Sequence, residues 1–129
     1  MRHEITSGRV GVKLVFALLV TCSLLLIGGT RASDLSTTGG LLGMCQSSGA
    51  DYAYCLGFVS GQAAVMEQVG VGGSGDFRGA MGMCVSMPYP AANAEVAAFI
   101  SWAQRNPQFW SKPSAVGVIL ALAATWPCA

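Results

Sequence analysis

Residues 51–69, which read DYAYCLGFVSGQAAVMEQV, decide the fold class of this chain. Their apolar side chains recur in steps of three and four, at Tyr52, Cys55, Val59, Ala63 and Met66. This spacing is typical of one face of an α-helix and differs from the strict alternation of a strand. Asp51 suits the first turn, as a cap and as a negative charge at the positive end of the helix dipole. The stretch therefore predicts a helix that begins near Asp51.

Two glycines lie inside this predicted helix, four residues apart and hence on one face. A glycine in a helix interior costs about 1 kcal/mol relative to alanine. We therefore expect Gly57 and Gly61 to let a neighbouring helix pack closely, because such packing would offset that cost.

The flanking segments on both sides predict three more helices. Ser36, Thr37 or Thr38 can cap a short helix that runs to Cys45, with Leu41, Leu42 and Cys45 on its inner face. A third helix runs from about residue 91 to residue 105, where an Asn-Pro pair stops it. Its predicted inner positions are Val96, Phe99, Ile100 and Ala103.

The last helix opens at Ser111-Lys112-Pro113 and ends at Trp126-Pro127, since proline is favoured in a first turn. Its predicted core stripe is Val116, Ile119, Leu120 and Ala123. Residues 70–83 (GVGGSGDFRGAMGM) are predicted to be a glycine-rich connector. Alternating strand patterns are nearly absent. We therefore expect an all-α fold, a small disulfide-stabilised bundle of about four helices with its cysteines at helix ends.

The first 32 residues have the pattern of a secretory signal peptide. Arg2, His3, Arg9 and Lys13 precede the uncharged run 14–27 (LVFALLVTCSLLLI). Fourteen residues are too few to cross a bilayer comfortably, because a spanning helix needs about 20. Thr30 and Ala32 then supply small residues for cleavage after Ala32. We predict export, a signal peptide at 1–32 and a domain at 33–129; the alternative is an uncleaved anchor.

Four cysteines remain after that cleavage, at Cys45, Cys55, Cys84 and Cys128. An even number in a short exported chain is typical of two disulfides. The alternative, a four-cysteine zinc site, lacks the close Cys-x-x-Cys pair that zinc ribbons use. Three disulfide connectivities are open, and the spacing does not choose among them.

Composition and residue types argue against several functional classes. The chain is 53% hydrophobic and 10% charged, and residues 33–129 hold three basic and five acidic side chains, for a net charge of −2. No basic face is available for nucleic acid. The only histidine is His3, in the leader, so Ser–His and Cys–His nucleophile pairs are excluded from the domain. Contact with a membrane is expected only during export, through the signal peptide.

Cofactor and carboxylate chemistry is equally weakly supported. Gly70-x-Gly72-x-x-Gly75 spells a dinucleotide fingerprint, but a helix precedes it where a strand is required. Paired carboxylates could in principle hydrolyse a glycoside. We expect the candidates, Asp51, Glu67, Asp76 and Glu95, to be solvated helix faces and caps. We therefore expect no cofactor, no metal and no enzymatic activity.

Binding of a partner protein is the better supported function. Two predicted connectors hold aromatic residues beside polar or charged ones: Asp76, Phe77 and Arg78 in the first, and Gln108, Phe109 and Trp110 in the second. Aromatic residues and arginine are common interface anchors. We predict these six as partner-binding residues; the alternative is that Phe109 and Trp110 fold back over the end of the bundle.

The order of several elements resembles one known family. These are Leu41-Leu42, Cys45, Cys55-x-Gly57-Phe58-Val59-x-Gly61, Cys84-Val85, Phe99-Ile100, Asn106-Pro107, Pro113-Ser114-Ala115, Ala121-Leu122 and Trp126-Pro127-Cys128. Together they resemble the Rap/Tai family, periplasmic immunity proteins that neutralise peptidoglycan amidases of type VI secretion. The resemblance covers residues 37–128. It implies a helical, often dimeric inhibitor that plugs the cleft of an amidase effector in the periplasm and performs no chemistry.

Two other functional classes stay open at this stage. One is a periplasmic helical binding or chaperone-like protein without a toxin partner. The other is a small cell-wall enzyme, which turnover of peptidoglycan by the purified domain would reveal.

Overall fold

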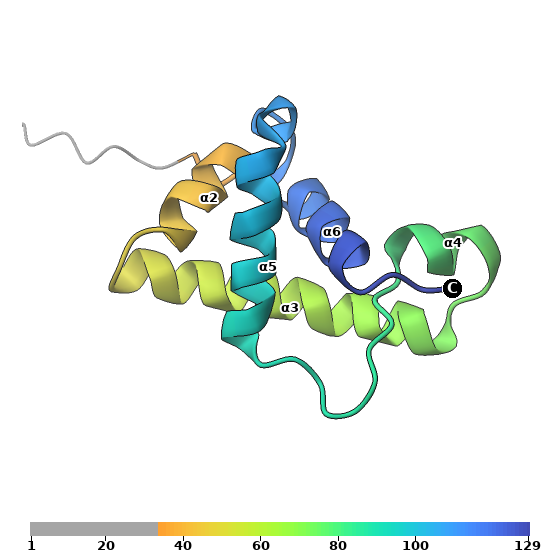
Figure 1. The fold of residues 1–129 in the computed structure, drawn as a ribbon. Helices are drawn as coiled ribbons and strands as arrows, with labels where there is room; N and C mark the ends of the chain where they lie inside the picture. Colours follow the sequence, from red (N-terminus) through yellow and green to blue (C-terminus); the bar gives the residue numbers. More distant parts are fainter. Residues whose placement is uncertain (1–33) are drawn as a thin grey trace, which may run out of the picture. The chain divides into compact units, whose positions relative to one another are not determined.

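The computed structural model describes residues 34–129. The predicted signal peptide, which includes Cys22, and its cleavage site after Ala32 lie outside the described residues. Along the chain come α2 (Thr38–Cys45), α3 (Ala50–Gly72), α4 (Gly75–Met81), α5 (Ala92–Arg105), a 3₁₀ turn η1 (Pro107–Phe109) and α6 (Ser114–Thr125). Within the described part there are five α-helices and no strand, which confirms the all-α prediction (Figure 1).

Helix α3 is the longest element, and the other helices pack along it. Its predicted inner face is confirmed, because Cys55, Val59, Ala63 and Met66 are buried. Helix α5 crosses α3 (Figure 1), and its Phe99 is completely buried. Helices α2 and α6 contact each other as well as α3 and α5, and they complete the core through Leu41, Leu42, Val118 and Leu122. The described helices include none that is both long and apolar enough to cross a membrane.

Backbone contacts join the starts of α2 and α6. Thr37 caps α2, since its hydroxyl accepts a hydrogen bond from the Gly40 amide at 3.1 Å, as predicted. The amide of Thr38 donates to the Lys112 carbonyl at 2.8 Å, and the amide of Ser114 donates to the Ser36 carbonyl at 2.9 Å. These bonds fix α6 beside α2 although more than 70 residues separate them.

The predicted core stripe of α6 is wrong. Its buried residues are Ser114, Gly117, Val118, Ala121 and Leu122, whereas Val116 is exposed and Ile119, Leu120 and Ala123 are only half-buried. The helix reads SAVGVILALAAT, with apolar residues on every face, so periodicity could not select the buried face. Gly117 decides the orientation instead: a Cβ there would overlap the buried side chain of Thr38.

The connector at 70–83 is also more ordered than predicted. Helix α3 continues to Gly72, and Gly75–Met81 form the short helix α4. Gly75, the first residue of α4, adopts a φ of 59°, which glycine tolerates. The reversal between α3 and α4 lets α4 pack against both α3 and α6.

The expected role of Gly57 and Gly61 is wrong. Both are exposed, and a Cβ on either would meet no atom within 4 Å. The close approach occurs at Gly70, where a Cβ would overlap the backbone carbonyl of Met83 and lie 3.2 Å from the Cys84 sulfur. Glycine spacing alone could not distinguish an exposed position from a packed one.

The four cysteines of the domain form two disulfides, as predicted. Cys45–Cys55 joins the end of α2 to α3, and Cys84–Cys128 joins the segment after α4 to the end of the chain. The second bridge closes a span of 44 residues. The structure thus selects one of the three connectivities that the sequence left open.

Candidate functional site

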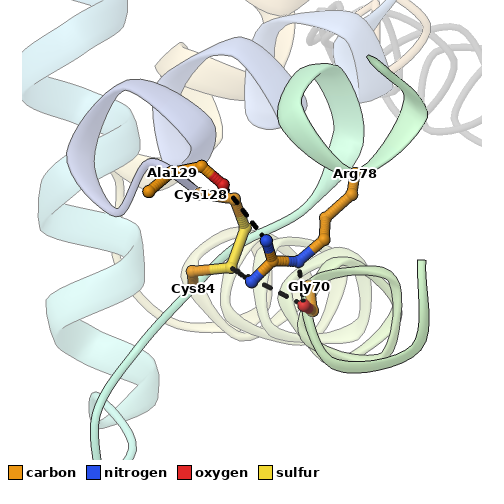
Figure 2. The surroundings of a disulfide bond; sticks show 5 residues. All are labelled: Gly70, Arg78, Cys84, Cys128 and Ala129. Carbon is orange, nitrogen blue, oxygen red and sulfur yellow. Dashed lines mark hydrogen bonds between the residues drawn. A yellow bond between two sulfur atoms is a disulfide. The ribbon is translucent and has the colours of Figure 1, made fainter. Parts of the chain in front are cut away.

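Arg78 of α4 organises the surroundings of the Cys84–Cys128 disulfide (Figure 2). Its Nε donates a hydrogen bond to the Gly70 carbonyl at 2.6 Å. One terminal nitrogen, Nη1, donates to the main-chain oxygen of Ala129 at 3.1 Å, and the other, Nη2, donates to the Cys84 sulfur at 3.3 Å. One guanidinium therefore ties α4 to α3, to the disulfide and to residue 129.

The segment after α4 is held on two further sides. The Met83 amide donates to the Met66 carbonyl of α3, and the Cys84 amide donates to the Trp126 carbonyl after α6, both at 3.0 Å. Met83 is buried in the core between these bonds. The disulfide therefore sits on a backbone that α3 and α6 fix from opposite directions.

A cavity of about 250 Å³ opens beside this framework. Its lining residues are Glu67, Gly70, Val71, Arg78, Met83, Cys84, Val85 and Tyr89. Small-molecule and cofactor sites usually occupy about 300–1,000 Å³. The cavity is therefore better matched to a single long side chain than to a cofactor. The sequence did not indicate Glu67 or Tyr89 as site residues, although Tyr89 stands between two prolines that end regular structure there.

Large apolar side chains are exposed on the segments that form the cavity. Val71 is 78% exposed, Met87 74%, Phe77 59% and Tyr89 50%. Val71 and Tyr89 also line the cavity, and we call these two residues the cavity rim. Exposed apolar surface at a groove is typical of interaction sites, whereas single scattered residues are ordinary.

The predicted residues of the first connector belong to this region. Asp76 and Phe77 are exposed on α4 and free to meet a partner. Arg78 is half-buried, and its three guanidinium nitrogens all make internal hydrogen bonds. Its role in this structure is to position α4.

The predicted residues of the second connector lie in and just after η1. Phe109 packs on Trp102 with ring centroids 5.3 Å apart. The Trp110 indole Nε1 donates to the Ala103 carbonyl at 2.9 Å, while 44% of the side chain stays exposed. Gln108 is exposed and donates to the Asn106 side chain. Both aromatics thus fold back over the end of the bundle, and Trp110 also keeps a free surface.

The two predicted segments lie at opposite ends of α6. η1 immediately precedes α6, whereas α4 is bonded through Arg78 to residue 129, beyond its far end. The twelve residues of α6 span about 18 Å. The structure therefore does not bring the six predicted residues together into one compact site.

Glu95 corrects the expectation that the carboxylates are solvated. Its side chain is 5% exposed at the start of α5, and its Oε2 has no hydrogen-bond partner. The hydroxyl of Ser60 on α3 is likewise buried and unpartnered. Burial raises the pKa of Glu95, the nearby hydroxyl of Ser60 partly offsets this, and the negative charge of Glu67 raises the pKa further. The spacing of Glu95 from Phe99 and Ala103, four and eight residues, could have indicated this burial.

No group of His, Cys, Asp or Glu within residues 34–129 is arranged to hold a metal ion. What the described region offers is a small cavity with an exposed apolar rim, beside a disulfide and the arginine that ties α4 to it. These features define a small disulfide-bonded helical protein suited to binding another protein.

Comparison with known families identifies the particular class. The family model of the Rap1a immunity proteins matches residues 37–128, which comprise nearly the whole described region and all four of its cysteines. The chain belongs to the Rap1a immunity protein family. Membership indicates an immunity protein for a secreted type VI effector, in a family whose members are typically exported. No curated protein and no solved structure matches the chain.

Proposed function

We propose that this chain is a periplasmic immunity protein that binds a type VI secretion peptidoglycan amidase and blocks its active site. The observation that carries the proposal is the family match over residues 37–128, which coincides with the disulfide-bonded helical domain. The protein acts by occupying the amidase surface and performs no chemistry itself. Its leader, residues 1–32, exports it to the compartment where peptidoglycan is exposed, and cleavage follows Ala32.

We further propose that α4 and the η1 region supply the partner contacts. Phe77 and Asp76 offer an exposed aromatic ring beside a carboxylate. Gln108 and Trp110 offer a second exposed contact, which Phe109 supports by packing on Trp102. With the two regions separated by the length of α6, an amidase would have to contact both ends of the bundle or select one.

The resemblance to the Rap/Tai family also supports a homodimer. Light scattering coupled to size-exclusion chromatography on the exported domain measures this directly. A mass of two chains supports the proposal, and a mass of one chain at all concentrations up to those of the binding experiments contradicts it.

Protection of cells tests the proposed function. The proposed cognate amidase is expressed with an export signal, and cell lysis is followed with and without this chain. The full chain should prevent lysis, whereas residues 33–129 without the leader should not, because they stay in the cytoplasm. A catalytically inactive amidase is the control for toxicity unrelated to cell-wall cleavage. Lysis that continues in the presence of the full chain contradicts the proposal and favours a periplasmic binding or chaperone-like role without a toxin partner.

A further inference from the structure

The two charged side chains in the cavity beside the Cys84–Cys128 disulfide differ in their hydrogen bonding. Two charged residues line it, Glu67 and Arg78. The guanidinium nitrogens of Arg78 all donate to internal acceptors, as Figure 2 shows. The carboxylate of Glu67 forms no hydrogen bond or ion pair with any residue of the described region, and it lies near enough to Glu95 to raise the pKa of that carboxyl. Glu67 is therefore an acid without an ion pair, and the nitrogens of Arg78, the other charged residue of the lining, donate to other acceptors.

The remaining walls suit the stem of a long side chain. Val71, Met83 and Val85 are apolar, and Tyr89 offers a half-exposed aromatic ring at the rim. A guanidinium or ammonium group is attracted both by a carboxylate and by the face of an aromatic ring. Lysine and arginine also bury their methylene stems along apolar surfaces while keeping the charged end near polar groups.

Size and overall charge favour the same occupant. About 250 Å³ is less than small-molecule sites usually occupy, and it is room for one side chain. The described residues hold five acidic and three basic side chains, for a net charge of −2, and one of the three basic groups is the internally bonded Arg78. A partner that presents a basic side chain would be attracted by the carboxylate of Glu67 and by the overall negative charge.

We infer that the cavity receives one arginine or lysine side chain projecting from the effector, with its charged end against Glu67 and Tyr89. The exposed side chain of Val71 on the cavity rim then meets an apolar neighbour of that basic residue. This inference rests on the proposed function for the identity of the partner. The family resemblance implies that the immunity protein plugs the cleft of the amidase. In this inference the amidase also inserts a side chain into the immunity protein.

Two pairs of variants test the inference by calorimetric titration with the proposed cognate amidase. Glu67→Gln removes the cavity charge, and Asp51→Asn removes an equal charge from the exposed first turn of the same helix. Tyr89→Leu removes the aromatic ring that lines the cavity. Tyr54→Leu removes a similarly exposed ring from α3, outside the cavity lining. We expect Glu67→Gln to raise the Kd by about 10-fold or more and Tyr89→Leu by about threefold, with both controls within about twofold. Circular dichroism confirms that each variant is folded.

The results separate this inference from the proposed function. If the amidase binds all five proteins equally, or if Glu67→Gln and Asp51→Asn weaken binding by the same factor, the cavity does not take a basic side chain, although the immunity function stands. If the amidase binds none of them, the proposed partner is wrong. Binding to the cavity is then tested with a blocked Phe-Arg-Phe tripeptide and its citrulline analogue, and NMR of the domain is the readout. Shifts of the Tyr89 signals with the arginine peptide alone support the inference, and no shift with either peptide overturns it.

Discussion

Replacing Gly70 by alanine should destabilise the domain, whereas the same change at Gly61 should stabilise it. A Cβ at position 70 would overlap the backbone carbonyl of Met83. That backbone cannot move aside cheaply, because the Met83 amide is bonded to α3 and the next amide is bonded to Trp126 after α6. Overpacking of this kind costs about 1–3 kcal/mol, and a fixed backbone atom places the cost toward the upper end. Gly61 faces open space, so alanine there gains about 0.5–1 kcal/mol of helix propensity.

Thermal unfolding followed by circular dichroism at 222 nm measures both effects with the disulfides intact. In a domain of this size 1 kcal/mol corresponds to about 4–8 °C, so Gly70→Ala should lower the Tm by about 10–20 °C and Gly61→Ala should raise it by about 3–6 °C. Urea unfolding gives the free energies independently. Equal Tm values for Gly70→Ala and the wild type, or a large loss with Gly61→Ala, would refute the assignment of the close contact to Gly70.

Three further predictions concern charge and covalent links. Because the pKa of Glu95 is raised on folding, the folded state binds the proton more tightly than the unfolded state does. The unfolding free energy of the wild type should therefore increase as the pH falls from 7.5 toward 4.5, the pKa of Glu95 in the unfolded chain. Glu95→Gln should remove that pH-dependent gain; an identical pH profile in urea unfolding contradicts the burial argument. Arg78→Met should loosen α4 and raise hydrogen exchange at residues 75–84, and unchanged exchange there would show that the three hydrogen bonds do not hold the helix. Serine at both Cys84 and Cys128 should cost about 4 kcal/mol in denaturant unfolding, against about 3 kcal/mol for the Cys45–Cys55 bridge, because the longer loop loses more entropy; the reverse order contradicts this.

The sequence was most informative where one helix face differs from the others. In α5, three of the four predicted inner residues, Val96, Phe99 and Ala103, are buried, and polar residues such as Asn93 and Gln104 are exposed. The same reasoning failed for α6, where Val116 and Val118 are equally apolar but only the second is buried. The difference arises from the contact of Gly117 with Thr38, which lies 79 residues earlier, and local periodicity contains no information about it.

The candidate site depended still more on contacts between distant residues. Phe77 was recognised as an exposed aromatic residue, but the bonds of Arg78 to residues 70, 84 and 129 could not be read from the glycine-rich stretch around it. Short helices such as α4 are stabilised mainly by tertiary packing, so propensity underestimated it. Glu67 emerged only when the fold placed it in a cavity with Tyr89.

Inhibition of the purified amidase tests the central claim most directly. The exported domain is titrated into the proposed cognate amidase, at an enzyme concentration well above the Kd, while the release of soluble fragments from peptidoglycan is followed. The account predicts a linear loss of activity that reaches zero at one domain per amidase, and it predicts that the domain alone releases no fragments. Full amidase activity in the presence of a severalfold excess of folded, disulfide-bonded domain would contradict it.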